Sequence, residues 1–299
     1  MPKLKTNEKN LVKIAVQGKI AAAYQWAPFE VEHDGRPFAL PSTGGITYNV
    51  KVGDPAGGWE GDHVEPGVSA VWDEEKRSSK QNSGFNFLAC CGNSARVVSG
   101  GAKGARGTVI GHHGGVEHVI IDFDGRALGR MTLDDKILIE AFGQGIKLVD
   151  YPDVTIYSID PGLLGKIGLK PSRGGGLRVP VTTIVPAEVM GSGIGALNVG
   201  TGDYDIMTHD PKTVRKHGID KIRLGDLIAI MDHDNRYGRT FRPGAVSIGV
   251  VIHADSLLAG HGPGVSTIMT CERPVLKPVR DPNANVGRIL GIGRYRGRR

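Results

Sequence analysis

Aromatic residues, cysteines and long apolar runs are all scarce in this sequence of 299 residues. Aromatic residues make up only 6% and do not interleave with basic ones, which argues against a platform for stacking nucleic-acid bases. The three cysteines are Cys90, Cys91 and Cys271, and an odd number with two adjacent members makes a poor disulfide framework. No apolar run could span a bilayer, and residues 1–10 do not lead into a signal peptide. These absences favour a protein of the reducing cytoplasm that does not act in a membrane.

Glycine, in contrast, is abundant. The chain has 45 glycines, about 15% of its residues and roughly twice the usual share. They follow no collagen-like period, so they indicate turns and close backbone approaches. Many short strands joined by tight turns need this composition, because only glycine enters positive φ without strain. The sequence therefore predicts a mainly β protein with few short helices.

Two β-rich halves, each resembling a barrel or a sandwich, are predicted at 1–150 and 151–299. The segments 133–139 and 224–230 are similar, since each has a turn acid followed by an alternating apolar strand. The stretch 150–178 is rich in glycine and proline and is the predicted boundary. One helical turn is predicted at Pro211–His217, because Asp210 is a good N-cap and Gly218 stands at the C-terminal stop.

Two β runs, 108–110 and 117–123, are joined by glycine-rich turns. Through Gly104, Gly107 and Val109 their spacing resembles the KOW motif of small ribosomal and transcription-associated β-barrels. The net charge is +6, and four of the last six residues are arginines. Together these features support an alternative function as an RNA-binding or ribosome-associated protein.

The densest group of acids and histidines lies between residues 230 and 265. One buried apolar strand, 227–231, ends in a run of acids, and a second, 246–252, is followed by His253. Nitrogen and oxygen ligands held at strand ends suit a divalent metal, with zinc or manganese preferred. The predicted metal ligands are Asp232, Asp234, His253 and Asp255.

This group predicts a metal-assisted hydrolase or lyase that acts on a small polar, anionic metabolite. The metal would lower the pKa of a bound water. His261, in a glycine-rich loop, would transfer the proton, and Arg236 or Arg239 would orient the anionic end of the substrate. In a third interpretation, the protein is a structural homo-oligomer, and these residues only form turns.

Three further segments carry weaker signals of the same kind. The first is the histidine-rich stretch 112–118, followed by Asp122 and Asp124, and the second contains Asp62, His63 and Glu65. The third is the glycine loop 191–195, which lacks a following helix and therefore does not bind phosphate as a P-loop does. It could line a site through Asn198, Asp203 and Asp205.

The segments 102–123, 200–206 (GTGDYDI), 232–238 (DHDNRYG) and 253–264 (HADSLLAGHGPG) resemble a prokaryotic family defined by a domain of unknown function. The likeness covers most of the chain and implies a β-rich, two-part homo-oligomer. The chain also resembles the acetamidase/formamidase family of metal-dependent β proteins at 225–226, 253–254 and 260–262. That family's Gly-Asp-Gly-Glu run is absent, so its catalytic carboxylate has no counterpart here.

Overall fold

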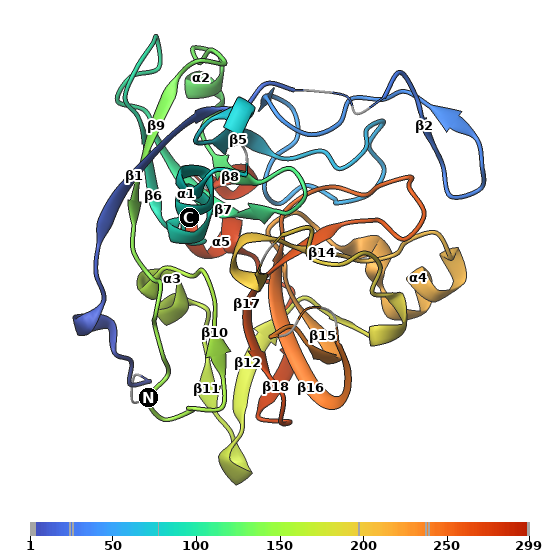
Figure 1. Cartoon of the computed structure of the whole chain (residues 1–299). Coiled ribbons are helices and arrows are strands. Elements are labelled where there is room, and N and C mark those ends of the chain that lie inside the picture. The colour runs from blue at the N-terminus through green and yellow to red at the C-terminus, as the bar shows by residue number, and fades with distance from the viewer. Residues whose placement is uncertain are drawn as a thin grey trace.

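The N-terminal half forms a closed antiparallel β-barrel. The computed structural model describes residues 4–297 except positions 24, 26, 77, 197, 237 and 239 (Figure 1). Six strands form a ring in the order β1-β9-β6-β7-β8-β5, which closes because β1 also pairs with β5, and β4 is added to β5 as an edge strand. Their bounds are β1 Ile14–Ile20, β4 Ile46–Thr47, β5 Gly67–Val71, β6 Ser94–Val97, β7 Arg106–His113, β8 His118–Asp122 and β9 Lys136–Ala141.

The C-terminal half contains a six-stranded sheet built on a long hairpin. The order is β10-β17-β16-β15-β13, with β14 also paired to β17. The pairs are antiparallel except that β13 runs parallel to β15. The bounds are β10 Thr155–Ile156, β13 Thr183–Val185, β14 Tyr204–Asp205, β15 Leu227–Asp234, β16 Thr240–Val251 and β17 Gly264–Cys271.

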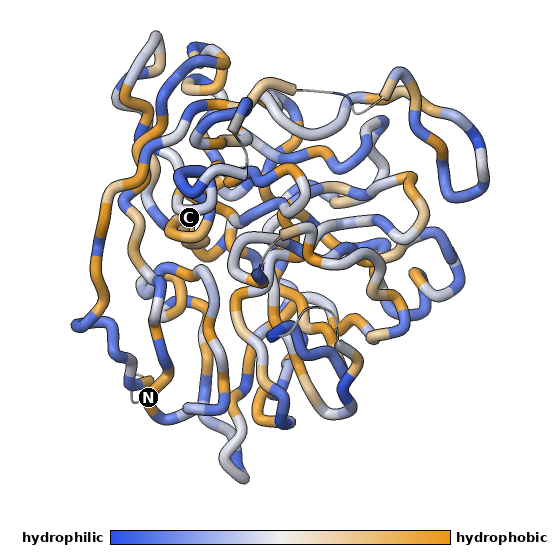
Figure 2. Tube along the Cα trace, viewed as in Figure 1, coloured by the Kyte–Doolittle hydropathy of each residue, from blue (hydrophilic) through white to orange (hydrophobic). Residues whose placement is uncertain are grey.

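Two small sheets complete the strands. One has the order β11-β12-β18, and the other is the hairpin β2-β3. Their bounds are β2 Glu30–Val31, β3 Pro37–Phe38, β11 Lys170–Pro171, β12 Leu177–Val181 and β18 Leu276–Arg280. Figure 2 shows hydrophobic stretches running along the strands of both halves, while the peripheral loops are mostly hydrophilic. The predicted mainly β fold is confirmed.

The five α-helices of the described residues are short. They are α1 Lys80–Leu88, α2 Gly125–Leu128, α3 Pro161–Lys166, α4 Pro211–His217 and α5 Val286–Leu290. The prediction for α4 is confirmed: Asp210 accepts hydrogen bonds from the first-turn amides, and Gly218 ends the helix with a φ of 69°. No helix in this part of the chain combines the length and the apolarity that crossing a membrane requires.

Strand β8 and the second part of β7, from Val109 to His113, lie between the two halves and are buried on both faces. Val109 and Ile121 point into the barrel core, whereas Ile110 and Ile120 pack with residues of the C-terminal half. Successive side chains of a strand point to opposite faces, so such a strand contributes to two cores at once. The β runs predicted here are confirmed, and their turn faces the C-terminal half.

Segments of each half also contact the other half. The predicted boundary at residues 150 and 151 lies between β9, the last barrel strand, and β10, the first strand of the second sheet. Residues before this boundary nevertheless pack with residues after it, since Pro55 bridges to Arg223 and the Arg294 amide donates to the Val52 carbonyl. Side chains from both halves can therefore meet in one place.

Candidate metal centre

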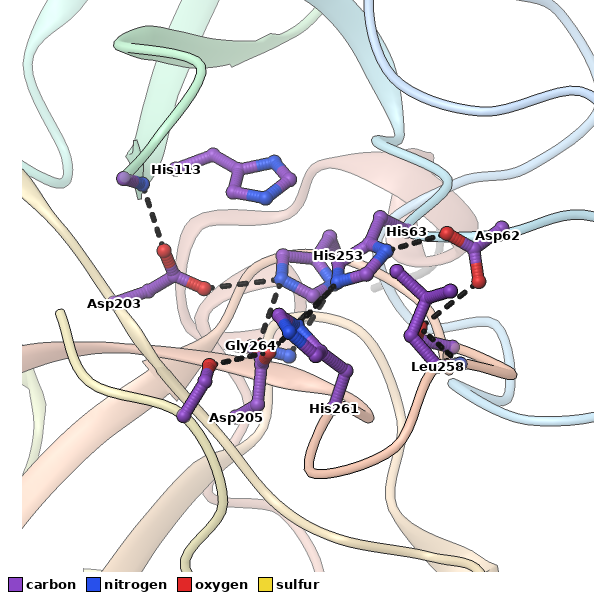
Figure 3. A network of polar contacts seen from close by, with 12 residues as sticks. Asp62, His63, His113, Asp203, Asp205, His253, Leu258, His261 and Gly264 are labelled. Carbon is purple, nitrogen blue, oxygen red and sulfur yellow. Dashed lines mark hydrogen bonds and ion pairs between the residues drawn. The ribbon is translucent and has the colours of Figure 1, made fainter. Parts of the chain in front are cut away.

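Six histidine and aspartate side chains converge between the two halves. They come from the loop before β5, the end of β7, the segment entering β14 and the loop that joins β16 to β17. Figure 3 shows them pointing toward one another. Most of them line a cavity of about 300 Å³. We call this set the His/Asp cluster; its members are His63, His113, Asp203, Asp205, His253 and His261.

The cluster divides into two groups of three ligands. In the first group, His261 Nδ1 lies 2.7 Å from Asp205 Oδ2 and 3.1 Å from His63 Nε2. His63 Nε2 lies 3.7 Å from the same Asp205 oxygen. The ligand atoms of each group all lie within 4.8 Å of one another. Such spacings are those of side chains that can share one ion.

The second group consists of His113, Asp203 and His253. His253 Nε2 lies 3.0 Å from Asp203 Oδ2, and the His113 and His253 rings stack with centroids 4.2 Å apart. Asp203 is held from the other side, because its Oδ1 accepts a 2.7 Å hydrogen bond from the Gly114 amide. All three residues of this group are buried. The group is therefore placed by packing as well as by hydrogen bonds.

Three of the histidines have their Nδ1 atoms engaged outside the cluster. His63 Nδ1 lies 2.6 Å from Asp62 Oδ2, and His113 Nδ1 lies 2.7 Å from Glu65 Oε1. His253 Nδ1 lies 2.7 Å from the Ala254 carbonyl. Because carboxylates accept hydrogen bonds, Nδ1 of His63 and of His113 donates, and the lone pair of each neutral ring is on Nε2. Nδ1 of His253 donates to the Ala254 carbonyl in its shorter contact, although the Gly264 amide also lies 3.3 Å from it. Outer partners orient metal-binding histidines in this way.

Asp62 and Glu65, which we call the outer carboxylates, are themselves held in place. Asp62 Oδ1 accepts from the Ser256 hydroxyl and the Leu257 amide, both at 2.9 Å. Glu65 is fully buried; it accepts from the Gly44 amide at 2.9 Å and contacts His118 Nδ1 at 2.9 Å. Burial opposes ionisation of Glu65, but the two histidines beside it hold its pKa well below the usual value. The outer carboxylates thus hold the rings of His63 and His113 in place.

Protonated histidines compensate the two cluster aspartates. Among the described residues, no lysine or arginine lies within 4.0 Å of Asp203 or Asp205. Burial lowers the pKa of His63, yet hydrogen bonds to Asp205 and Asp62 outweigh it and raise the pKa to about 9. The pKa of His253 is likewise raised well above its usual value by Asp203 and Asp205, despite its burial. Protons therefore occupy a place where a metal cation could substitute for them.

The backbone around the cluster requires glycine. A Cβ at Gly264 would lie 2.1 Å from both Asp203 Oδ2 and His253 Nε2, so no other residue fits there. A Cβ on Gly114 would lie 2.0 Å from the Ile194 carbonyl oxygen. His63 itself has a φ of 50°, a strained value for a residue other than glycine. Close packing thus brings the polar groups of separate loops into contact.

Two of the residues predicted from the sequence, His253 and His261, lie in the cluster, and Asp255 lies beside it. Asp255 Oδ1 accepts from the Thr208 hydroxyl at 2.5 Å and from the Ser256 amide at 2.9 Å. The strand ends at Val251, so the two-residue alternation that would place Asp255 with His253 does not continue. Its carbonyl instead accepts from the His63 amide and helps to place that ligand.

The structure does not bring Asp232 and Asp234 together with His253. Asp234 pairs with Arg236 at 2.9 Å and with Arg242 at 3.3 Å. Asp232 Oδ1 accepts from the Gly244 amide, as a turn residue does. In the antiparallel hairpin, Asp234 lies opposite Thr240, roughly 35 Å along β16 from its other end. The C-terminal ends of β15 and β16 therefore lie at opposite ends of the hairpin.

Of the two predicted substrate-orienting arginines, the structure describes Arg236, which does not line the cluster cavity. Arg236 contacts Asp234 and Glu272, and Arg239 lies outside the described residues. In the basic C-terminal segment, Arg294 and Arg296 pair with Asp54 and Asp122 of the same chain. Binding of RNA through this segment stays a prediction.

The weaker sequence signals supply the rest of the cluster. His63, His113 and the Asp203–Asp205 pair each stood in a separate candidate segment, and the fold unites them. Glycine lies within two residues of one ligand in each of four segments. These stretches are Gly61-Asp62-His63, His113-Gly114-Gly115, Gly202-Asp203 and Gly260-His261-Gly262.

Comparison with known proteins identifies the family. Residues 29–165 match the N-terminal model and residues 166–290 the C-terminal model of the domain of unknown function DUF4438. The chain belongs to the DUF4438 family. It is also similar to the structure titled "Crystal structure of TM1086", with 47% identity, a TM-score of 0.89 and coverage of 96% of this chain and 99% of that one. No curated protein matches the chain. The predicted family resemblance is confirmed, and the likeness to acetamidases stays a prediction.

Proposed function

We propose that this DUF4438 protein is a metal-dependent hydrolase whose active site is the His/Asp cluster. One observation supports it above all: two buried aspartates and four histidines converge, all of them except His253 line one cavity, and no described lysine or arginine balances the acids. Buried carboxylates are costly unless a positive charge balances them, and a bound cation would replace the protons of the histidines that balance these two.

The donor atoms suit a divalent transition metal. Imidazole nitrogen with carboxylate oxygen is the ligand set of zinc, manganese and iron sites, and zinc or manganese is our assignment. Two ligands on a tetrahedral zinc ion lie roughly 3.3 Å apart. The observed separations of 2.7 to 3.7 Å in the cluster bracket that value. We assign His261 as a ligand, because its Nδ1 faces the same point as the other members of its group.

The metal would supply an activated water, and the cavities would hold the substrate. A larger cavity of about 890 Å³ shares Gly115 and Gly195 with the cluster cavity. Outside the cluster, Glu117 is the one charged side chain among the described residues that line the two cavities. The buried Asn86 lines the larger cavity, and its Oδ1 has no hydrogen-bond partner among the described residues. We therefore propose a small, uncharged polar substrate that donates a hydrogen bond.

A combined metal and activity measurement tests this function. The purified protein is analysed for bound metal and assayed against small uncharged amides, esters and lactones, before and after chelation. We expect bound metal, turnover of at least one class, loss of turnover on chelation and recovery with zinc or manganese. A protein without metal affinity would contradict the whole proposal. A metal-loaded protein inactive on every class would contradict the hydrolase assignment alone.

A further inference from the structure

We propose that the His/Asp cluster holds two metal ions bridged by the carboxylate of Asp205, an inference that rests on the proposed function. Asp205 faces the two ligand groups with different oxygens. Its Oδ2 lies 2.7 Å from His261 Nδ1 in the first group, and its Oδ1 lies 3.3 Å from His253 Nε2 in the second. Ions in two-metal sites lie about 3.5–4 Å apart, a separation that one bridging carboxylate can span.

The number of ligands fits two ions better than one. A catalytic zinc ion has three protein ligands and keeps an open position for water. Six protein donors around one ion would leave no such position. Divided into the two groups, they give each ion two histidines and one aspartate, and Asp205 Oδ1 adds a shared contact. The first ion would keep an open position for water or substrate, and the second, with Asp205 Oδ1 as a fourth donor, would bind water or substrate as a fifth ligand.

The distribution of charge is equally symmetrical. Each group has one aspartate within it and one outer carboxylate behind it: Asp62 behind His63, and Glu65 behind His113. Asp62, Glu65, Asp203 and Asp205 are all buried. Their four negative charges balance two divalent cations, whereas a single cation would leave two buried carboxylates to be neutralised by protons. The outer layer thus repeats the division into two groups.

Metal titration of the full-length protein measures the number of ions. Metal is removed with a chelator, Mn²⁺ or Zn²⁺ is added back, and bound metal per chain is determined after desalting. We expect two ions per chain, and for Mn²⁺ an electron paramagnetic resonance spectrum with exchange coupling between the ions. Saturation at one ion would overturn this inference and leave the proposed function standing. No bound ion would overturn both.

Single-ligand variants test the assignment of each group. His113→Ala removes a ligand of the second group, and His261→Ala one of the first; each should retain one ion and lose the coupling. Asp205→Asn should lose the coupling and bind at least one ion more weakly. Asp134→Asn, at an exposed turn position, is the matched control and should keep two coupled ions. Folding is checked by circular dichroism of each metal-free form. Two uncoupled ions in the wild type, or unchanged coupling in folded Asp205→Asn, would overturn the bridge.

Discussion

The two ends of the β15–β16 hairpin place buried aspartates in opposite circumstances. At one end, Asp234 is paired with the guanidinium groups of Arg236 and Arg242. At the other, histidines are the only basic side chains among the described residues that pair with Asp203 and Asp205. Arginine keeps its positive charge, so a carboxylate paired with it needs no further cation. Histidine can lose its proton, so a metal ion can replace the protons of histidines that face a carboxylate. The residue that supplies the positive charge beside a buried aspartate therefore distinguishes a structural ion pair from an ion-binding site.

The largest predicted contrast comes from the same substitution at the two ends. Asp205→Asn should reduce bound metal by at least one ion per chain and abolish turnover, because the cluster loses the carboxylate shared by both groups. Asp234→Asn should retain full metal and activity but lower the free energy of unfolding by about 2 kcal/mol, since Arg236 and Arg242 lose their partner. Metal analysis with denaturant unfolding checks both. Equal metal loss in the two variants would contradict the assignment of Asp205 as a metal ligand and Asp234 as a member of a structural ion pair.

Backbone crowding at Gly264 should have the next largest effect. Gly264→Ala places a Cβ against Asp203 and His253 and should displace the second ligand group, with loss of metal from it. In helix α3, a Cβ added at Gly165 would have no atom within 4 Å. Gly165→Ala should therefore raise the free energy of unfolding by up to about 1 kcal/mol. Metal content and thermal unfolding of both variants measure this. Undiminished metal in Gly264→Ala would show that the two side chains are not ligands.

Removal of the outer carboxylates should weaken binding without removing a ligand. Asp62→Asn and Glu65→Gln should each lower metal affinity by about 10–100-fold. The reason is that His63 and His113, respectively, lose the negatively charged acceptor of their Nδ1 proton. Competition with a coloured chelator gives the affinities, and Asp134→Asn again serves as the control. Affinities equal to the wild-type value would mean that these carboxylates support the fold alone.

A decrease of one pH unit should have the smallest effect on metal affinity among these changes. Because the pKa of His63 is about 9 in the metal-free protein, its proton must leave before a metal binds at neutral pH. A raised histidine pKa means tighter proton binding, so metal affinity falls as pH falls, by about tenfold per pH unit for each displaced proton. Calorimetric titration between pH 6 and 8 measures the slope. An affinity independent of pH over this range would argue against metal binding by these histidines.

Local patterns predicted much of the fold. The glycine content, the strand runs around Val109 and Ile120, and the caps of α4 depend on neighbouring residues, so the sequence displays them directly. The convergence of His63, His113 and Asp205 depends instead on how two halves pack across a shared pair of strands. Such contacts join residues far apart in the chain, for example His63 and His261, which are 198 positions apart, and no local period records them.

The candidate site shows where local reasoning failed. Both Asp234 and His253 follow apolar strands, and the sequence suggested that these strand ends are neighbours. For consecutive antiparallel strands the opposite holds, because the end of one lies beside the start of the next. Recognition of the hairpin from the short connection between 234 and 240 would have separated the two.

Anomalous X-ray diffraction from crystals grown with zinc or manganese tests the central claim most directly. We expect strong anomalous peaks within bonding distance of His63 and His261 on one side and His113 and His253 on the other, with Asp205 between them. A map that shows no peak there, and retains the direct hydrogen bond between His253 and Asp203, would contradict a metal centre in this cluster.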